Sequence, residues 1–299
     1  MNPDWIALDW GTSKLRAWAM ASDGTVLAED HSDLGMINVP AGGFEMALLA
    51  SIDEWLPEDR ETTVIAAGMV GARQGWQEVP YRDLPCGGFD ADQMVRVGAD
   101  DPRLDLRILP GLRQLEHPDV MRGEETQIFG FLSENPGFEG VICLPGTHSK
   151  WVQVSGGAIQ SFSTFMTGEI FAWLSEQSIL RHSMGAGWDE AAFLSGVSEG
   201  FGAPGRLTAN LFGIRTASLL GDVPEGAGIA RLSGMLIGTE IAAAQPGDRP
   251  VALIGGTGVT TKYAAALQSL EFEAATYDAG VASRNGLQAA YRAVQGTAS

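Results

Sequence analysis

Residues 6–14 read Ile-Ala-Leu-Asp-Trp-Gly-Thr-Ser-Lys, a short apolar run that ends at an acid and enters a turn of small residues. Residues 141–150 read Val-Ile-Cys-Leu-Pro-Gly-Thr-His-Ser-Lys and repeat the Gly-Thr turn and its lysine 135 residues after Gly11. Asp23-Gly24 follows the first copy and Gly156-Gly157 follows the second, and both pairs are typical of hairpin turns. The chain is therefore expected to contain one unit twice: strand, Gly-Thr turn, strand, glycine turn, strand.

The rest of the chain has a mixed α/β pattern. Apolar residues recur with helical spacing in several segments, and an all-apolar strand at 250–254 stops at two glycines. Further short strands are expected at 64–68 and 107–109. The predicted helices cover residues 43–56, 124–132, 167–180, 207–220, 230–244, 259–267 and 284–294.

The length of 299 residues suits two domains of ordinary size. Proline, glycine and His117-Pro118 cluster between residues 110 and 140, which marks the expected boundary. We expect a first domain over 1–118, a connecting helix or hinge over 119–139 and a second domain over 140–299. The last helix is expected to pack back on the first domain.

The composition excludes several classes of protein. The 37 acids and 19 bases give a net charge of −18, which argues against binding to nucleic acid or to an anionic membrane surface. Two cysteines, Cys86 and Cys143, cannot form a disulfide framework and are expected to be inert. The sequence shows no signal peptide and no apolar run of the roughly 20 residues that cross a bilayer. These features predict a cytoplasmic enzyme that holds anions locally, through backbone amides and a few cations.

The repeated turn has the residue types of a phosphate-binding loop. Glycine lets backbone N–H groups approach phosphate oxygens, and threonine and serine hydroxyls add donors without bulk. Asp9 comes just before the first loop, where a carboxylate can hold Mg²⁺ through its waters. The loop residues are Gly11, Thr12 and Ser13 in the first copy and Gly146, Thr147 and Ser149 in the second, with Lys14, Arg16 and Lys150 as nearby cations.

A third glycine site, residues 253–258, ends the buried strand and opens a helix. A turn of this kind can receive the flat side of a nucleotide or its ribose. The three sites in this order resemble the actin/sugar-kinase/heat-shock-protein-70 superfamily: Asp9-Trp-Gly-Thr-Ser matches its first phosphate loop, and Arg16 matches an arginine of FGGY-type sugar kinases. Gly255 and Gly256 match the adenosine motif, whereas Pro145 stands where the second loop usually begins with aspartate. The resemblance implies a duplicated ribonuclease-H-like, actin-like ATPase fold with two domains around a nucleotide cleft.

Four further segments narrow the resemblance. Residues 67–81, 120–127, 144–151 and 166–169 are similar to those of 2-dehydro-3-deoxygalactonokinases, and the similarity covers essentially the whole chain. It implies ATP- and Mg²⁺-dependent phosphorylation of the 6-hydroxyl of 2-dehydro-3-deoxy-D-galactonate, in galactonate catabolism. The partners are then the sugar acid and ATP, and assembly as a homodimer is left open.

The resemblance and the residue chemistry together give the candidate site. Glu124 is preferred over Glu125 as the general base, with Asp83 as the main rival; both glutamates could instead be acids favoured by the start of a helix. Arg73 or Arg122 is expected to grip the substrate carboxylate. Nucleotide binding is assigned to Gly11, Thr12, Ser13, Lys14, Arg16, Gly146, Thr147, His148, Lys150, Gly255, Gly256 and Thr257, and substrate binding to Met69, Gly71, Arg73, Gly75, Trp76, Tyr81, Arg122, Thr167, Gly168 and Glu169.

Two other functions fit parts of the pattern. A phosphatase of the same superfamily would use Glu124 or Glu125 to activate water, and an actin-type assembly protein would bind ATP without turnover. The segment 68–81 favours the kinase, because neither rival needs a sugar pocket. The three tryptophans at positions 5, 10 and 18 are expected to pack in the core and not to stack on a base.

Overall fold

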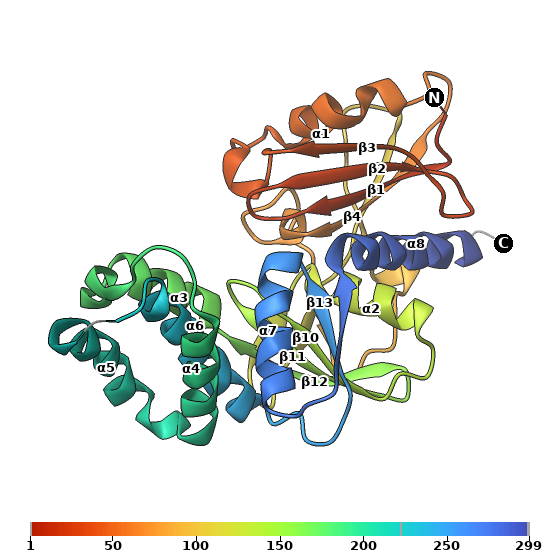
Figure 1. The fold of residues 1–299 in the computed structure, drawn as a ribbon. Coiled ribbons are helices and arrows are strands. Elements are labelled where there is room, and N and C mark those ends of the chain that lie inside the picture. Colours follow the sequence, from red (N-terminus) through yellow and green to blue (C-terminus); the bar gives the residue numbers. More distant parts are fainter. Residues whose placement is uncertain (1, 222, 298–299) are drawn as a thin grey trace. The chain divides into compact units, whose positions relative to one another are not determined.

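The computed structural model describes residues 2–221 and 223–297, so the outermost ends of the two predicted domains lie outside the described residues. The chain forms two compact units (Figure 1). Unit 1 comprises Met1–Phe138, Gly156–Gln160 and Ala279–Ser299, and unit 2 comprises Glu139–Ser155 and Ser161–Asp278. The segment 119–139, predicted as a hinge, lies in unit 1 up to Phe138, Glu139 begins unit 2, and its action as a hinge stays a prediction.

Unit 1 is built on a six-stranded sheet with the order β3-β2-β1-β4-β7-β6. A smaller sheet has the order β5-β8-β9. The strands are β1 (Trp5–Trp10), β2 (Leu15–Met20), β3 (Val26–Ser32), β4 (Thr62–Gly68), β5 (Arg82–Asp83), β6 (Val95–Arg96), β7 (Leu104–Ile108), β8 (Leu112–Gln114) and β9 (Asp119–Met121). The helices are α1 (Phe44–Ile52), α2 (Glu124–Glu134) and α8 (Ala279–Thr297).

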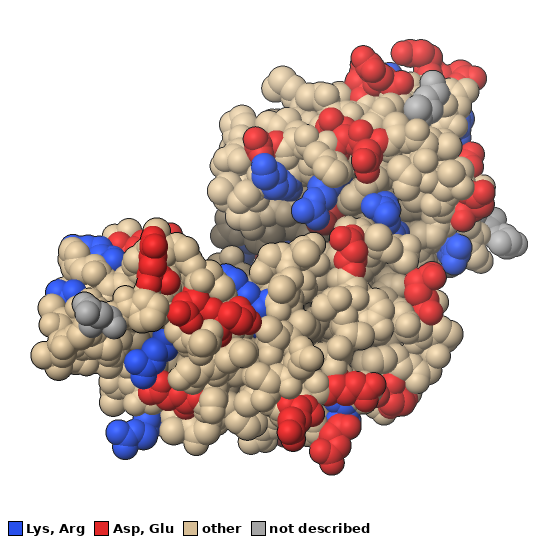
Figure 2. Space-filling view, viewed as in Figure 1, with Lys and Arg blue, Asp and Glu red and all other residues tan. Residues whose placement is uncertain are grey.

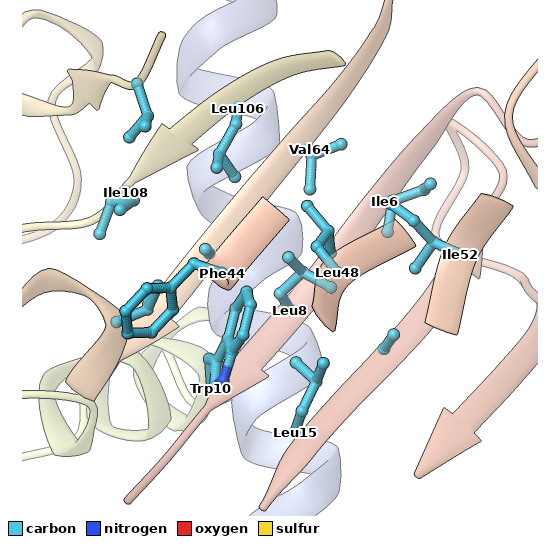
Figure 3. Close-up of a cluster of buried hydrophobic side chains, with 14 of the residues drawn as sticks. Ile6, Leu8, Trp10, Leu15, Phe44, Leu48, Ile52, Val64, Leu106 and Ile108 are labelled. Atoms are coloured by element: carbon cyan, nitrogen blue, oxygen red, sulfur yellow. The ribbon is translucent and has the colours of Figure 1, made fainter. Parts of the chain in front are cut away.

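Strand β1 is buried on both faces, which explains why its sequence is almost entirely apolar. Alternate side chains point to opposite faces of a strand. Ile6, Leu8 and Trp10 pack against Phe44 and other residues of α1 (Figure 3). Trp5 and Ala7 face the other way, into a cluster completed by Leu287, Ala290, Tyr291 and Val294 of α8. The last helix of the chain thus closes the core of unit 1, and Trp5, Trp10 and Trp18 are core residues, as expected.

Unit 2 contains most of a five-stranded sheet with the order β12-β11-β10-β13-β14. Helices α4 and α6 pack closely, and α6 contributes to two hydrophobic clusters. The strands are β10 (Gly140–Leu144), β11 (Ser149–Ser155), β12 (Ala158–Phe165), β13 (Val251–Gly255) and β14 (Ala274–Asp278). The helices are α3 (Thr167–Glu176), α4 (Glu190–Gly202), α5 (Leu207–Leu220), α6 (Ala227–Ala244) and α7 (Thr257–Ser269).

The two large sheets repeat one topology, which confirms the duplication predicted from the Gly-Thr turns. β1 pairs antiparallel with β2 and parallel with β4, and β10 pairs antiparallel with β11 and parallel with β13. A further parallel strand follows on the same side in each sheet, β7 beside β4 and β14 beside β13. Each Gly-Thr turn therefore joins the first two strands of its sheet.

The predicted helices are present, with ends that differ by several residues. Helix α1 ends at Ile52 and gives way to a 3₁₀ turn at Asp53–Trp55, and α3 ends at Glu176. Helix α4 and strand β14 were not predicted. The burial of α4 depends on packing against α6, which a local pattern does not reveal.

Acidic side chains are spread over the surface of both units on the face drawn in Figure 2, with lysines and arginines interspersed. No helix among residues 2–221 and 223–297 is long and apolar enough to cross a membrane. Cys86 and Cys143 are free and buried, and burial raises the pKa of the Cys143 thiol well above its usual value.

Candidate active site

Asp9 lies near the end of β1, directly opposite Arg16 of β2 in the antiparallel register. Its carboxylate oxygen Oδ2 lies 3.5 Å from Arg16 Nη1 and 3.4 Å from the hydroxyl of Ser283 in α8. Burial raises the pKa of Asp9, and the Arg16 charge and the Ser283 hydrogen bond partly offset that rise. The carboxylate is thus held by one cation and one hydroxyl, in a setting where a bound cation would favour its ionised form.

The first phosphate loop follows Asp9 and is fixed through its carbonyl groups. The Gly11 N–H donates to the Lys14 carbonyl, and the Gly11 and Thr12 carbonyls accept hydrogen bonds from Met36 and Ile37. In the part of the chain that the structure describes, the N–H groups of Thr12 and Ser13 donate no hydrogen bond. The loop therefore offers free amide donors of the kind that bind phosphate oxygens.

Lys14 is less available than the sequence suggested. Its ammonium group pairs with Asp33, and both side chains are exposed. Lys14 and Arg16 line a pocket of about 300 Å³ together with Leu15, His31, Ser32 and Asp33. An exposed ion pair contributes only about 0–1 kcal/mol, so Lys14 can exchange Asp33 for a phosphate at little cost.

The end of β4 lies beside the end of β1, next to Asp9. Gly68 is paired with Trp10 of β1, and a Cβ added at Gly68 would lie 2.7 Å from the Trp10 carbonyl oxygen. Gly123 in turn lies close to Gly68, since an added Cβ there would lie 3.3 Å from the Gly68 Cα. Both glycines have positive φ angles, 96° and 103°, which side chains rarely adopt. The start of α2 is thereby placed at the same sheet edge as Asp9.

The two glutamates at the start of α2 occupy different environments. Glu124 is half-buried and accepts a hydrogen bond of 3.0 Å from the Arg122 N–H. Glu125 is 1% exposed and accepts hydrogen bonds from the Gly123 N–H at 2.7 Å and the Thr126 hydroxyl at 3.1 Å. Burial, together with the nearby Glu124 charge, raises the pKa of Glu125 to about 8. Glu125 is therefore mostly protonated at neutral pH.

Asp83, the rival base, is exposed and bound by Arg113 at 2.6 and 3.4 Å. This partner lowers the pKa of Asp83. A carboxylate whose pKa is lowered is a weaker proton acceptor. Glu124 is the better placed of the two, because it lies at the sheet edge that carries Asp9.

The predicted sugar-acid segment folds as a compact loop after β4. It begins with a 3₁₀ turn at Met69–Gly71, and the Val70 carbonyl accepts the Trp76 N–H. Gly75 packs on the backbone of that turn, and Trp76 packs on Trp10 and Phe44. Trp76 is thus partly a core residue, which the lack of periodicity in its sequence did not indicate.

The two arginines proposed for the substrate carboxylate differ in their exposure and in the contacts that they make. Arg73 is 80% exposed and makes one ion pair of 3.4 Å with Glu78. The Arg122 guanidinium stacks 4.3 Å from the Tyr81 ring and donates to the Val79 carbonyl at 2.7 Å. Its Nε and Nη1 atoms are buried, and within the described residues they have no hydrogen-bond partner. Arg122 therefore braces the loop that contains Tyr81, whereas Arg73 is accessible to a ligand.

The second phosphate loop, in unit 2, packs on the start of α3. A Cβ at Gly168 would lie 2.4 Å from the Gly146 carbonyl oxygen, so only glycine allows this approach. The Thr147 carbonyl accepts the Glu169 N–H at 3.0 Å, and His148 Nε2 lies 2.5 Å from Glu169 Oε2. Gly168 and Glu169, predicted as substrate residues, thus contact the loop itself.

Beside this loop, the adenosine-type motif joins β13 to α7. Gly255 ends β13, Gly256 is the N-cap and Thr257 begins α7. The first N–H groups of a helix are natural donors to anions and other acceptors. A pocket of about 100 Å³ opens in unit 2, and its walls are Gly146, Thr167, Gly168, Phe171, Ser233, Leu236, Ile237, Val259, Lys262 and Tyr263.

Several residues of this region were not found from the sequence. Ser283 contacts Asp9 from α8, 274 residues later in the chain. Glu240 and Tyr263 form a buried hydrogen-bonded pair in unit 2. Glu240 stands inside an apolar helix pattern, and a buried acid at such a position was the available signal. In the described residues, no group of three or more His, Cys, Asp or Glu side chains could hold a metal.

The family model described as 2-keto-3-deoxy-galactonokinase matches residues 9–290. DgoK1 of Rhizobium meliloti (strain 1021), assigned as a 2-dehydro-3-deoxygalactonokinase, is 40% identical and covers 97% of each chain. The 2-dehydro-3-deoxygalactonokinase of Escherichia coli (strain K12) is 33% identical, over 98% of this chain and 99% of that protein.

Solved structures agree with these similarities. A crystal structure from Sinorhizobium meliloti, described as a candidate 2-dehydro-3-deoxygalactonokinase, has a TM-score of 0.89 and 40% identity, over 97% of this chain and 99% of that one. A candidate N-acetylglucosamine kinase from Porphyromonas gingivalis has a TM-score of 0.52 and 14% identity, over 95% and 98% of the two chains. That second likeness shows the fold alone, and together they confirm the predicted actin-like fold class.

Proposed function

Because the chain belongs to the 2-keto-3-deoxy-galactonokinase family, we propose that it transfers the γ-phosphoryl group of ATP to the 6-hydroxyl of 2-dehydro-3-deoxy-D-galactonate. Membership of this family confirms the predicted reaction class, a phosphotransferase acting on an alcohol. The observation that best supports the proposal within unit 1 is the meeting of Asp9, the free loop amides and the start of α2 at one sheet edge. Phosphoryl transfer requires positioning and charge neutralisation, and these groups provide both.

The residues present fit a magnesium ion held through few protein ligands. Mg²⁺ usually keeps several waters and binds one or two carboxylates together with substrate phosphates, so a three-residue metal cluster is not required. Asp9 is the carboxylate that we assign to it, and its raised pKa is consistent with a site completed by a cation. When bound, the ion would neutralise charge on the phosphate oxygens.

We assign the general base to Glu124. Its carboxylate is partly accessible at the start of α2, whereas Glu125 is buried and mostly protonated at neutral pH. Glu124 would accept the proton of the attacking hydroxyl, and Glu125 would hold the backbone of Gly123 in place. The protonated Glu125 also spares Glu124 a second adjacent negative charge.

We assign the substrate to the loop of residues 69–81. We place the C1 carboxylate on Arg73, because its guanidinium is exposed, whereas Arg122 is enclosed between the Tyr81 ring and the Val79 carbonyl. A guanidinium fork offers two parallel hydrogen bonds to a carboxylate. The remaining assigned substrate residues are Met69, Gly71, Gly75, Trp76, Tyr81, Thr167, Gly168 and Glu169.

We assign nucleotide binding to both phosphate loops and to the start of α7. In unit 2 the pocket beside Gly146 has apolar walls, including Phe171 and Val259, which suit the flat face of a base. Lys262 lines the same pocket and supplies a cation. A cytoplasmic location and assembly as a homodimer stay predictions.

The proposal is tested by a coupled assay of ADP release with a panel of sugar acids. We expect turnover with 2-dehydro-3-deoxy-D-galactonate, dependent on both ATP and Mg²⁺, and little turnover with sugars that lack the carboxylate. Phosphate release without a sugar acid would indicate a phosphatase. ATP binding with polymerisation and no acid-dependent turnover would indicate an assembly protein.

A further inference from the structure

A buried chain of polar groups runs from the second phosphate loop into the interior of unit 2. Ser149, the last of the loop residues named from the sequence and the first residue of β11, is fully buried, and its hydroxyl lies 3.0 Å from the Tyr263 hydroxyl. The Tyr263 hydroxyl lies 2.9 Å from Glu240 Oε2, and Trp151 Nε1 donates to Glu240 Oε1 at 2.7 Å. Both Tyr263 and Glu240 are 2% exposed.

While Glu240 is ionised, each hydroxyl in this hydrogen-bonded network has one defined acceptor. A tyrosine hydroxyl has one proton, and Tyr263 donates it to the carboxylate. The Ser149 hydroxyl must then donate to the Tyr263 oxygen. The carboxylate of Glu240 therefore orients Ser149 through Tyr263, from a distance of two hydrogen bonds.

The same groups reach the walls of the pocket. Tyr263 and Thr167 both line it. Burial raises the pKa of Glu240, and side-chain hydrogen bonds, that from Thr167 first among them, partly offset the rise. The network thus joins α6, α7, β11 and the start of α3 around the Gly146 turn. A buried carboxylate is a costly way to obtain stability alone, since an apolar residue of the same volume often serves as well or better.

We propose that Glu240 and Tyr263 are positioning residues that hold the second phosphate loop, Gly146 to His148, in the conformation that binds the nucleotide. The proposal rests on the assignment of that loop to ATP. Neither residue needs to touch the nucleotide phosphates for this role, because Ser149 carries the effect to the loop.

The test compares two variants that break the chain at neighbouring links. Tyr263→Phe keeps the ring and removes the hydroxyl, and Ser149→Ala removes the other partner. Loss of one buried hydrogen bond corresponds to about a tenfold change in affinity, so we expect each variant to raise KM for ATP about tenfold and to leave KM for the sugar acid within twofold. The double variant should be no worse than the poorer single variant, because both break one link.

Trp151→Phe is the matched control. It removes a buried hydrogen bond to the same carboxylate but leaves the link from Tyr263 to Ser149 intact. We expect it to lower Tm by a similar amount to Tyr263→Phe while KM for ATP stays within twofold of wild type. If Tyr263→Phe and Ser149→Ala also leave KM for ATP within twofold, the network is merely structural and the proposal is wrong.

Calorimetric titration with a non-hydrolysable ATP analogue separates this proposal from the proposed function. Wild-type protein that binds the analogue but never turns over a sugar acid would overturn the function and leave the network testable by affinity. In that case, tenfold weaker binding by Tyr263→Phe would support the positioning role, and unchanged binding would overturn it. Wild-type protein that binds no nucleotide would overturn both.

Discussion

Asp9 is held by Arg16 and Ser283, and burial raises its pKa. Asp9→Asn keeps the size of the side chain but removes the charge that we assign to Mg²⁺. We expect kcat to fall by on the order of 100-fold or more, as for other lost electrostatic groups at reacting centres. Steady-state kinetics with Mg²⁺ titration measures this, and circular dichroism should show an unchanged fold. Near wild-type turnover at saturating Mg²⁺ would remove Asp9 from the mechanism.

The adjacent glutamates give a paired prediction. Glu124→Gln should lower kcat by about 100-fold or more, because general base catalysis is worth that much, while both KM values stay close to normal. Glu125→Gln resembles the protonated carboxyl group that the folded protein already has at pH 7, so it should retain most activity. Parallel kinetics at pH 7 tests the pair. If Glu125→Gln is instead the variant with the large loss of kcat, the assignment of the base within the pair is reversed.

Arg73 tests the placement of the substrate carboxylate. Its exposed pair with Glu78 is weak, so the guanidinium is available to a ligand. Arg73→Ala should raise KM for the sugar acid about 10- to 100-fold, since a charge-assisted contact is worth roughly 1.5–3 kcal/mol. Arg73→Lys should recover only part of this loss, because an ammonium lacks the fork. A rise in KM for ATP alone would instead place Arg73 with the nucleotide.

At the scale of single residues, the sequence indicated candidate site residues that stand together in one motif. It did not indicate residues that come into contact only when distant segments of the chain pack together. Asp9, the loop glycines and Glu124 could be proposed as site residues because each stands beside a recognisable turn. Ser283 was missed because α8 packs on β1 from the other end of the chain. Arg122 was found, but its stacking on Tyr81 depends on the close approach of two loops that no spacing reveals.

Helices α2 and α8 lie side by side in unit 1 and position Glu124 and Ser283 (Figure 1). Their contact is very close: a Cβ added at Gly286 would lie 1.9 Å from the Thr126 carbonyl oxygen. Gly286→Ala must therefore push the helices apart, at a cost of about 1–3 kcal/mol or more. We expect a Tm several degrees lower and a reduced kcat, measured by thermal unfolding and steady-state kinetics.

Gly296→Ala is the control on the same helix. A Cβ at Gly296 would have no neighbour within 4 Å, and alanine favours a helix over glycine by about 1 kcal/mol. This variant should be as stable as wild type or slightly more so. Equal Tm values for Gly286→Ala and wild type would mean that the two helices can separate without loss.

At the scale of elements, local periodicity predicted helices that lie on a sheet with one apolar face. It failed for α4, whose glycines Gly196 and Gly200 let it pack tightly on α6. Glycine lowers helix propensity, so the sequence of α4 alone does not predict a helix. Packing against α6 stabilises it. The strand β14 was missed because it is mostly exposed and lies at a sheet edge, where no apolar run is required.

Across the whole molecule, the duplicated turn was enough to predict two sheets of one topology. The predicted family was confirmed by the match over residues 9–290. Which segments of the chain form each unit was less predictable, since the chain returns to unit 1 at Gly156–Gln160 and at Ala279. Both returns depend on packing between segments far apart in sequence, for which one sequence holds no direct signal.

The buried carboxyl groups make the stability of the molecule depend on pH. The pKa of Glu125 is about 8 in the folded protein and about 4.5 in the unfolded chain, so between these values only the folded state keeps the proton. The stabilisation from Glu125 is therefore fully present below about pH 4.5, decreases as pH rises and is lost above about pH 8. Asp9 and Glu240, whose pKa values are also raised, act in the same direction.

Glu125→Gln should flatten this dependence, because the amide stays neutral at every pH. We expect Tm of the wild-type protein to fall from pH 5.5 to pH 8.5 by several degrees more than Tm of the variant, in line with a contribution of a few kcal/mol. Repulsion from the net charge of −18 also grows with pH, but it is present in both proteins and cancels in the comparison. Asp83→Asn serves as the control, since the pKa of Asp83 is lowered and its effect is confined to acid pH. Identical slopes for wild type and Glu125→Gln between pH 5.5 and 8.5 would show that Glu125 is already ionised in the folded protein, and Glu125 would then compete with Glu124 as the base.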